Sequence, residues 1–245
     1  MPQQNRPFVL ETRTKKSLYF SIREVQSRMD RRRPDALELE YTRTMAGFLL
    51  FRPQPSNILM IGLGGGSLAK YCHRHLIQTH IRVVEINPYV IALRDDFQVP
   101  PESDRFSIIQ EDGANFVRAA SHQCDVLMVD GFDQQGQPEP LASQDFYDNC
   151  FGMLPPGGIL IVNLLFGQPS YVQQIERIRH SFKGEILTVN DAHFGNSIVF
   201  AARERSLAAL RFEHLWQPRP PGAAPSKSMQ GAFARILSAL RESTS

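Results

Sequence analysis

The 245-residue sequence has little that would suggest export, membrane insertion or a disulfide scaffold. Its three cysteines, Cys72, Cys124 and Cys150, are odd in number and lack CxxC spacing, which argues against a disulfide framework or structural zinc. No apolar run approaches the roughly 20 residues that span a bilayer. The N-terminal stretch MPQQNRPFVLETRTKK also lacks the apolar core of a signal peptide. We therefore expect a cytoplasmic protein with no membrane partner.

The sequence also lacks a surplus of charge, because 27 basic residues face 25 acidic ones and the formal net charge is +2. The basic cluster Arg31, Arg32 and Arg33 is too short to follow a phosphate backbone, so we interpret it as a solvated turn and expect no nucleic-acid partner. A hydrophobic content of 42% and a charged content of 21% are ordinary for a globular protein. The length fits one α/β domain with small appendages.

Hydrophobic periodicity predicts the order of elements. Residues 8–25 alternate apolar and polar side chains, which indicates two short strands in a small N-terminal β hairpin. Residues 36–51 have helical spacing. From residue 58, apolar runs alternate with amphipathic segments, as is typical of a parallel sheet covered by helices on both faces. The parallel strands are expected at 58–62, 81–86, 105–110, 125–130 and 158–165.

The last two predicted strands, at 184–190 and 196–203, differ from the others. Only five residues separate them, which is too short for a crossover helix, so they should form an antiparallel hairpin. Five parallel strands followed by such a hairpin indicate a Rossmann-like class I methyltransferase fold. Residues 217–228 read as a linker, and 229–243 as an amphipathic helix packed on the domain or on a partner subunit. We thus expect an N-terminal hairpin (1–36), a nucleoside-binding catalytic domain (37–204) and a C-terminal linker and helix (205–245).

The motif GLGGGS joins the first parallel strand to its helix. Its glycines at 62, 64 and 66 lack side chains, so a ligand can approach the backbone, and the helix that follows offers free N–H groups. The dinucleotide pattern GxGxxG would need glycine where Ser67 stands, and no GK[ST] follows, which excludes a P-loop. The alternative is a tight turn with a structural role only.

Acidic residues follow the next two strands. Glu85 ends the second strand, roughly 20 residues after the glycines, where a carboxylate accepts hydrogen bonds from ribose hydroxyls. It would repel a 2′-phosphate, so a nucleoside or NAD-like ribose fits better than NADP. Asp112, between Glu111 and Gly113, is placed to accept a hydrogen bond from an adenine amino group. The alternatives are an exposed carboxylate at 85 and a helix N-cap at 112.

Asp130 ends the fourth strand, and Asp133 follows three residues later. Strand carboxyl ends line the ligand crevice in this architecture, so these carboxylates would attract a cation and accept a proton from an attacking amine. The alternative is a turn in which Asp133 caps a helix. His73 and His75 point to different faces of one predicted helix, so we expect no metal site. His193, in the turn between the last two strands, is interpreted as structural.

Several of these stretches occur together in a fixed order that resembles the spermidine synthase family, and most closely its divergent spermidine synthase-like branch. The resemblance runs from about residue 37 to 203, and two details distinguish it from ordinary methyltransferases: Met60 before the glycine turn and a helix around Tyr41 before the first parallel strand. The stretches are LELEYTRTM, ILMIGLGGGSLAK, VVEINPYVI, EDGANFVR, DVLMVDGFD, LASQDFYDNCFGMLPPGGILIVN and GNSIVFA.

The resemblance implies a site for S-adenosylmethionine or its decarboxylated form as co-substrate, without a metal. It implies that Asp130 accepts a proton from the attacking amine, and that Tyr41 and Asp133 contact a small-molecule diamine. It also implies a homodimer. The residues implied to bind the co-substrate are Gly62, Gly64, Gly65 and Gly66 around the sulfonium, Glu85 at the ribose, and Asp112 with Gly113 at the adenine.

Some positions depart from the family pattern. Gly65 stands where the family has an aspartate that holds the donor amine, Asn87 replaces another aspartate, and Thr42 and Arg43 replace a histidine and a glutamate. Loss of a carboxylate at 65 favours ordinary S-adenosylmethionine. The leading hypothesis is aminopropyl transfer to a polyamine-type amine. The alternatives are a methyltransferase on the same fold, a catalytically degenerate binding protein and, more remotely, an NAD-dependent oxidoreductase.

Overall fold

The computed structural model describes residues 5–21, 24–119, 124–133, 136–191, 195–204, 207 and 227–243. A small antiparallel sheet is formed by β1 (Phe8–Glu11), β2 (Lys15–Ser21) and β3 (Glu24–Asp30), in that order. The expected two-stranded hairpin is therefore a three-stranded sheet. The third strand was missed because Ser27, a polar residue, takes one of its inward positions and is only 5% exposed.

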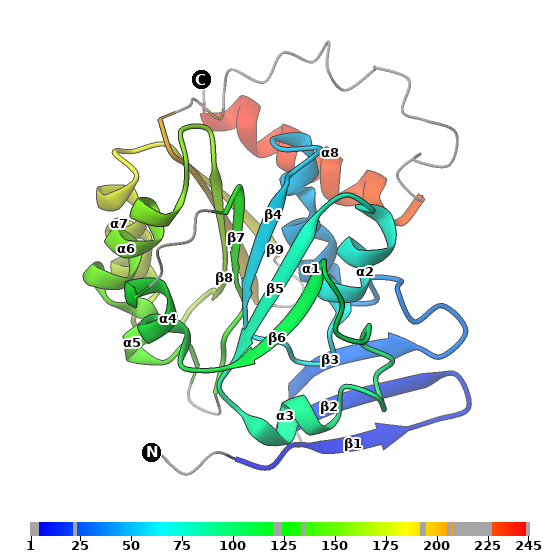
Figure 1. Ribbon diagram of the computed structural model, residues 1–245. Coiled ribbons are helices and arrows are strands. Elements are labelled where there is room, and N and C mark those ends of the chain that lie inside the picture. The colour runs from blue at the N-terminus through cyan, green and yellow to red at the C-terminus, as the bar shows by residue number, and fades with distance from the viewer. Residues whose placement is uncertain are drawn as a thin grey trace.

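The main sheet has seven strands in the order β6-β5-β4-β7-β8-β10-β9 (Figure 1). Its first five strands pair in parallel, as the sequence predicts. β10 (Asn196–Ala202) is antiparallel to both β8 and β9 (Ile186–Asp191), which confirms the terminal hairpin. The parallel strands are β4 (Asn57–Ile61), β5 (His80–Glu85), β6 (Phe106–Gln110), β7 (Val126–Val129) and β8 (Ile159–Leu165).

Helices cover both faces of this sheet, with α4 to α7 on one side and α1, α2 and α8 on the other (Figure 1). Successive strand residues point to opposite faces, so Ile58 and Met60 of β4 join one buried cluster, and Leu59 and Ile61 join the other. The helices between strands are α2 (Ser67–His75), α3 (Pro88–Ala92), α4 (Gly113–Ala119), α5 (Glu139–Ala142), α6 (Gln144–Met153) and α7 (Tyr171–Ser181).

The helix expected at 36–51 is shorter than its sequence pattern. It comprises α1 (Glu40–Met45) and the 3₁₀ helix η1 (Ala46–Leu50). The Arg43 guanidinium donates to the carbonyl oxygens of Leu37 and Glu38, at 2.7 and 3.1 Å, and so holds the segment before the helix in a non-helical conformation.

Helix α8 (Lys227–Ser243) packs on α1, η1 and β9. Gly47 makes room for it, because a Cβ at that position would lie 2.1 Å from Ile236 Cδ1. An ion pair of 2.5 Å joins Arg235 of α8 to Glu40 of α1. The terminal helix is therefore packed on the domain, while residues 217–226 of the expected linker lie outside the described residues. Within the described part of the chain, no helix is long and apolar enough to cross a membrane.

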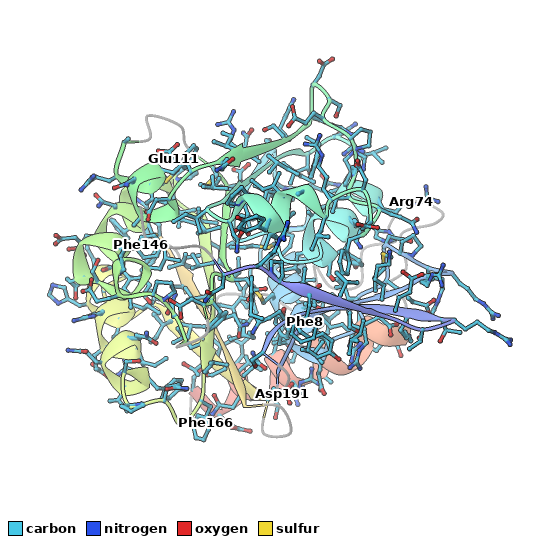
Figure 2. The ribbon with its side chains drawn as sticks, turned by 90° about the horizontal axis from the view of Figure 1, so that it is seen from below. Phe8, Arg74, Glu111, Phe146, Phe166 and Asp191 are labelled. Atoms are coloured by element: carbon cyan, nitrogen blue, oxygen red, sulfur yellow. The ribbon has the colours of Figure 1, made fainter. Side chains whose placement is uncertain are left out.

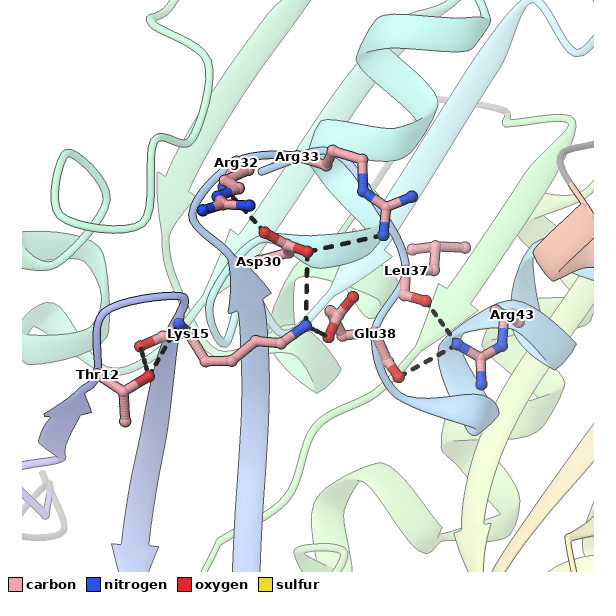
Figure 3. A network of polar contacts seen from close by, with 8 residues as sticks. All are labelled: Thr12, Lys15, Asp30, Arg32, Arg33, Leu37, Glu38 and Arg43. Carbon is pink, nitrogen blue, oxygen red and sulfur yellow. Dashed lines mark hydrogen bonds and ion pairs between the residues drawn. The ribbon is translucent and has the colours of Figure 1, made fainter.

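A polar network connects the small sheet to the start of α1 (Figure 3). The Lys15 ammonium of β2 contacts both Glu38, which precedes α1, and Asp30 of β3. Asp30 also accepts a hydrogen bond from the backbone N–H of Arg32 and pairs with the Arg33 guanidinium at 3.6 Å. The three-arginine cluster is thus part of the turn that follows β3, while the pair between Lys15 and Glu38 connects the small sheet to the segment before α1.

Candidate active site

A pocket of about 500 Å³ opens where the carboxyl ends of β4, β5 and β7 meet the small sheet. Figure 2 looks at the molecule from below, where β1, with Phe8, lies across this end of the main sheet. Residues from both sheets line the pocket, so it lies between the two. The polar side chains among its lining residues belong to Asn5, Gln26, Ser27, Tyr41, Thr42, Ser67, Glu85, Asn87, Asp112, Asp130 and Asp133.

The first half of the glycine turn lines the pocket. Gly62 and Gly64 line the pocket and have φ values of +98° and +52°, a region that favours glycine. Gly65 and Gly66 are not among the lining residues. A Cβ at Gly65 would lie 2.6 Å from the Oγ of Ser27, and one at Gly66 would lie 2.5 Å from Val99. The second half of the turn therefore packs against protein.

Glu85 is buried at the end of β5, with 8% exposure. Its Oε2 accepts a hydrogen bond from the backbone N–H of Leu63 at 2.8 Å, and its Oε1 accepts one from the backbone N–H of Asn87 at 2.8 Å. Burial raises the pKa of the Glu85 carboxyl, and the backbone hydrogen bonds oppose that rise. Glu85 thus fixes the glycine turn from the end of β5.

Asp112 has a structural role that the sequence left open as an alternative. Its Oδ1 accepts hydrogen bonds from the backbone N–H groups of Ala114 and Asn115, at 2.9 and 3.0 Å, and so caps α4. Asp112 and Gly113 both line the pocket. Asp112 therefore both caps α4 and lines the pocket, and its second oxygen is available for a ligand.

Asp130 follows β7 directly and connects the main sheet to α1 within the pocket. Its Oδ1 accepts a hydrogen bond from the Asn163 amide at 2.8 Å, and its Oδ2 accepts one from the Tyr41 hydroxyl at 3.2 Å. Burial raises the pKa of the Asp130 carboxyl, and these two donors lower it. Tyr41, desolvated beside this carboxylate, has a pKa well above its ordinary value, so it stays protonated and serves as a donor.

The positions that depart from the family pattern have clear structural partners. Thr42 lines the pocket, and its hydroxyl donates to the carbonyl oxygen of Leu39 at 2.6 Å. The Arg43 guanidinium points instead to the carbonyls before α1. Asn87 caps α3 by accepting from the backbone N–H of Tyr89 at 3.0 Å.

The remaining candidates divide between the pocket rim and regions outside it. Asp133 lines the pocket and is exposed at its rim. His73 and His75, on α2, are not among the lining residues, and His193 lies outside the described residues. In the ranges that the structure describes, no group of three or more potential metal ligands is found.

Sequence reasoning missed four residues that help to form this site. Gln26 and Ser27 line the pocket from β3, a strand that the sequence did not indicate. Asn163 contacts Asp130, and Asn196 contacts Asn163. Asn163 had a detectable signal, because it is the polar residue within the apolar run GILIVNLL and is 2% exposed. A buried amide in such a run requires a partner.

Comparison with known proteins gives a consistent result. Residues 38–183 match the family described as the spermine/spermidine synthase domain. The chain is 39% identical over 190 residues to the polyamine aminopropyltransferase of Chromobacterium violaceum, covering 77% of this chain and 73% of that protein. It is 38% identical over 188 residues to the enzyme of the same name from Neisseria meningitidis, covering 76% and 72%.

Solved structures show the same fold at lower sequence identity. A probable spermidine synthase from Corynebacterium glutamicum superposes with a TM-score of 0.72 at 20% identity, covering 80% of this chain and 76% of that one. A spermidine synthase in complex with the transition-state analogue AdoDATO superposes with a TM-score of 0.67 at 18% identity, covering 95% and 86%. These likenesses support the fold class that the sequence predicts.

Proposed function

The chain belongs to the spermine/spermidine synthase family, and from this premise we propose that it is a polyamine aminopropyltransferase. In this proposal it transfers an aminopropyl group from decarboxylated S-adenosylmethionine to a small polyamine-type amine. The observation that carries the proposal is Asp130, a carboxylate in the pocket with donors on both oxygens. The relatives that are 38–39% identical are themselves named aminopropyltransferases, so the methyltransferase alternative is not favoured.

The adenosyl part of the donor is assigned to the edge of the pocket formed by β4 and β5. Glu85, which lines the pocket at the end of β5, would accept hydrogen bonds from the ribose hydroxyls. Asp112 and Gly113 would contact the adenine, and Gly62 and Gly64 would lie against the sulfonium side. The fit rests on the chemistry of these groups, since a buried carboxylate between backbone donors is suited to a neutral diol.

The reaction assigned to Asp130 is a nucleophilic displacement. The nitrogen of a neutral amine attacks the carbon of the propyl group next to sulfur, an N–C bond forms, and the C–S bond breaks. The sulfonium leaves as a neutral thioether, and the proton lost by the amine passes to Asp130. A carboxylate with a raised pKa is a better proton acceptor than an ordinary aspartate. Tyr41 and Asp133 would hold the amine and the rest of the acceptor.

The aminopropyl tail carries an ammonium, and Gly65 leaves no carboxylate for it within the turn. Ser27 occupies the space that a side chain at 65 would need, and Ser27 and Ser67 place their hydroxyls 3.2 Å apart beside the turn. Both line the pocket, and a hydroxyl accepts a hydrogen bond from an ammonium. The sequence argument that Gly65 favours ordinary S-adenosylmethionine therefore loses its force, because the glycine accommodates β3.

The direct test supplies purified protein with decarboxylated S-adenosylmethionine and a panel of diamines, and detects the aminopropylated product by mass spectrometry. We expect product and thioether in equal amounts, no product from Asp130→Asn, and tighter calorimetric binding of the decarboxylated donor than of S-adenosylmethionine. Tighter binding of S-adenosylmethionine, together with a methylated acceptor, would contradict the proposal. If the wild-type protein forms no product and Asp130→Asn leaves ligand binding unchanged, the chain is a binding protein that performs no turnover.

We also propose that residues 37–204 form the catalytic unit and that the protein is a cytoplasmic homodimer. Three buried free cysteines suit a reducing compartment. Phe8 and Leu10 on β1 are 38% and 54% exposed, which supports the small sheet as a contact surface between copies. Light scattering coupled to gel filtration tests the dimer, and Leu10→Lys should convert it to a monomer if β1 is at the interface.

A further inference from the structure

Two asparagines outside the pocket form a chain of hydrogen bonds that ends on Asp130. The side-chain amide of Asn163, on β8, donates to Asp130 Oδ1 at 2.8 Å. The side-chain amide of Asn196, on β10, donates to Asn163 Oδ1 at 3.0 Å. Neither asparagine is among the residues that line the pocket, so any effect on a bound substrate passes through Asp130.

The register of the sheet places these two amides together. β8 and β10 are antiparallel, with Asn163 opposite Ile198 and Asn196 opposite Leu165, so the asparagines are diagonal neighbours on one face. Ile161 and Ile198 on that face belong to the buried cluster beneath it. An amide in such surroundings is costly unless it is hydrogen-bonded, and the chain of hydrogen bonds satisfies this requirement.

The direction of these hydrogen bonds determines which atom of Asn163 faces Asp130. A side-chain amide presents a donor at nitrogen and an acceptor at oxygen. Because Asn196 donates to the oxygen of Asn163, the nitrogen of Asn163 faces Asp130. A hydrogen bond donated to a carboxylate favours its ionised form, and it also limits rotation of the carboxylate.

We propose that Asn163 and Asn196 are positioning residues that keep Asp130 ionised and oriented toward the attacking amine. The proposal rests on the proposed aminopropyl transfer for its consequence in catalysis, but its effect on the Asp130 carboxylate does not depend on that activity. Burial acts in the opposite direction and raises the Asp130 pKa, so the relay from β10 through β8 opposes the effect of burial on the base.

Other titratable groups lie near this carboxylate. Tyr41, from α1, contacts Asp130 directly. Glu85, Asp112 and Asp133 line the same pocket, and Asp191 of β9 is the register partner of Asn196. All four carboxylates remain in Asn163→Leu and Asn196→Leu, which add no charge, so a change in the Asp130 titration can be assigned to the relay.

The experiment measures the Asp130 carboxyl pKa in the full chain by ¹³C NMR, with the resonance assigned by its loss in Asp130→Asn. Asn163→Leu removes the donor to Asp130 at similar volume, and Asn196→Leu removes the donor to Asn163 without adding a charge. Ser197→Ala is the matched control, because Ser197 is a buried polar residue of the same strand that bonds to Tyr171 and Asn190 instead.

We expect the Asp130 pKa to rise by about one unit or more in Asn163→Leu, as for the loss of one charge-assisted hydrogen bond. It should rise in Asn196→Leu and stay unchanged in Ser197→Ala. In the transfer assay the acidic limb of the kcat/KM profile should move by the same amount. The acceptor KM should stay within about twofold, since neither asparagine lines the pocket.

An Asp130 pKa unchanged in both asparagine variants would overturn the relay. A shift in Asn163→Leu without one in Asn196→Leu would overturn the part assigned to Asn196. If the wild-type protein transfers no aminopropyl group, the proposed function fails, while the NMR titration still decides the relay. If Asn163→Leu does not fold, Asn196→Leu provides the same measurement from the outer end of the hydrogen-bond chain.

Discussion

A Cβ placed on Gly62 would lie 2.3 Å from the carbonyl oxygen of Asp130, so the donor turn and the proposed base are in backbone contact. The glycine turn after β4 and the aspartate after β7 thus form one rigid corner of the pocket. The absence of a side chain at Gly62 allows this backbone contact and also leaves room for a ligand. The distance between the proposed sulfonium site and the proposed base is therefore set by main-chain packing.

Gly62→Ala should damage both fold and activity. The φ of +98° is strained for alanine, and the contact with Asp130 is to backbone, which cannot rotate away. We expect a loss of at least about 2 kcal/mol in the free energy of unfolding, measured by urea denaturation. Gly152→Ala in α6 is the control, because open space surrounds that position. It should stabilise the protein by about 0.5 kcal/mol.

Asp130→Asn should abolish transfer and stabilise the fold at neutral pH. The Asp130 pKa is higher in the folded than in the unfolded state, so folding favours the protonated form. Its ionisation therefore costs stability as the pH rises from the unfolded pKa through the folded one. The gain in melting temperature for Asp130→Asn should be largest above the folded pKa and should shrink at lower pH. A constant gain across that range would contradict the raised pKa.

Glu85→Gln should weaken donor binding without affecting the acceptor. A glutamine amide must direct its NH₂ group at one of the backbone donors, Leu63 N–H or Asn87 N–H, which now bond to the carboxylate. We expect donor affinity to fall about tenfold or more, as for the loss of a charge-assisted hydrogen bond, with the acceptor KM unchanged. Glu111→Gln, at an exposed position directly after β6, is the control.

Gly65→Asp tests the packing of the glycine turn against β3. The added Cβ would lie 2.6 Å from Ser27 Oγ and 2.9 Å from Phe97, so the single variant should lose stability. Removing the serine side chain in Ser27→Gly should relieve the closest contact, and the double variant should be more stable than the sum of the two single effects predicts. Thermal denaturation of all four proteins gives the coupling. Additive losses would show that the two positions do not share this space.

Ile236→Ala tests how α8 supports the wall that carries Tyr41. Ile236 is fully buried against Gly47 of η1, so the substitution leaves a cavity worth about 2 to 5 kcal/mol. We expect that loss of stability together with a lower kcat, because η1 continues directly from α1. Ser238→Ala, on an exposed position of the same helix, should change neither quantity. Full activity in Ile236→Ala would separate α8 from the site.

Much of this architecture could be predicted from residue patterns. The apolar strands and the five-residue gap between 190 and 196 led to the parallel sheet with a terminal hairpin, because both depend on local periodicity and loop length. Glu85, Asp112 and Asp130 can be assigned to the crevice because each lies at or just after the carboxyl end of a parallel strand. Such positions are defined by the fold class itself.

The rest depends on contacts that local patterns do not encode. The sequence does not predict β3, because Ser27 takes a buried position where an apolar residue would indicate a strand. The packing of Gly65 against Ser27 is not predictable from the sequence, since only the structure brings the two together. Asn196 lies 33 residues after Asn163 and meets it through a strand register. No spacing rule along the chain connects them.

The strand order has a consequence for how the protein folds. β9 precedes β10 in the chain, yet it lies at the sheet edge, and its strand partner is β10. Amide protection in β9 should therefore not precede that in β10 during refolding, as pulse-labelling hydrogen exchange can measure. Docking of β10 on β8 also brings Asn196 to Asn163. The proposed base thus acquires its full hydrogen-bond support only once β10 has paired with β8, and chains in which β10 has not yet docked would carry an Asp130 without the link from Asn196.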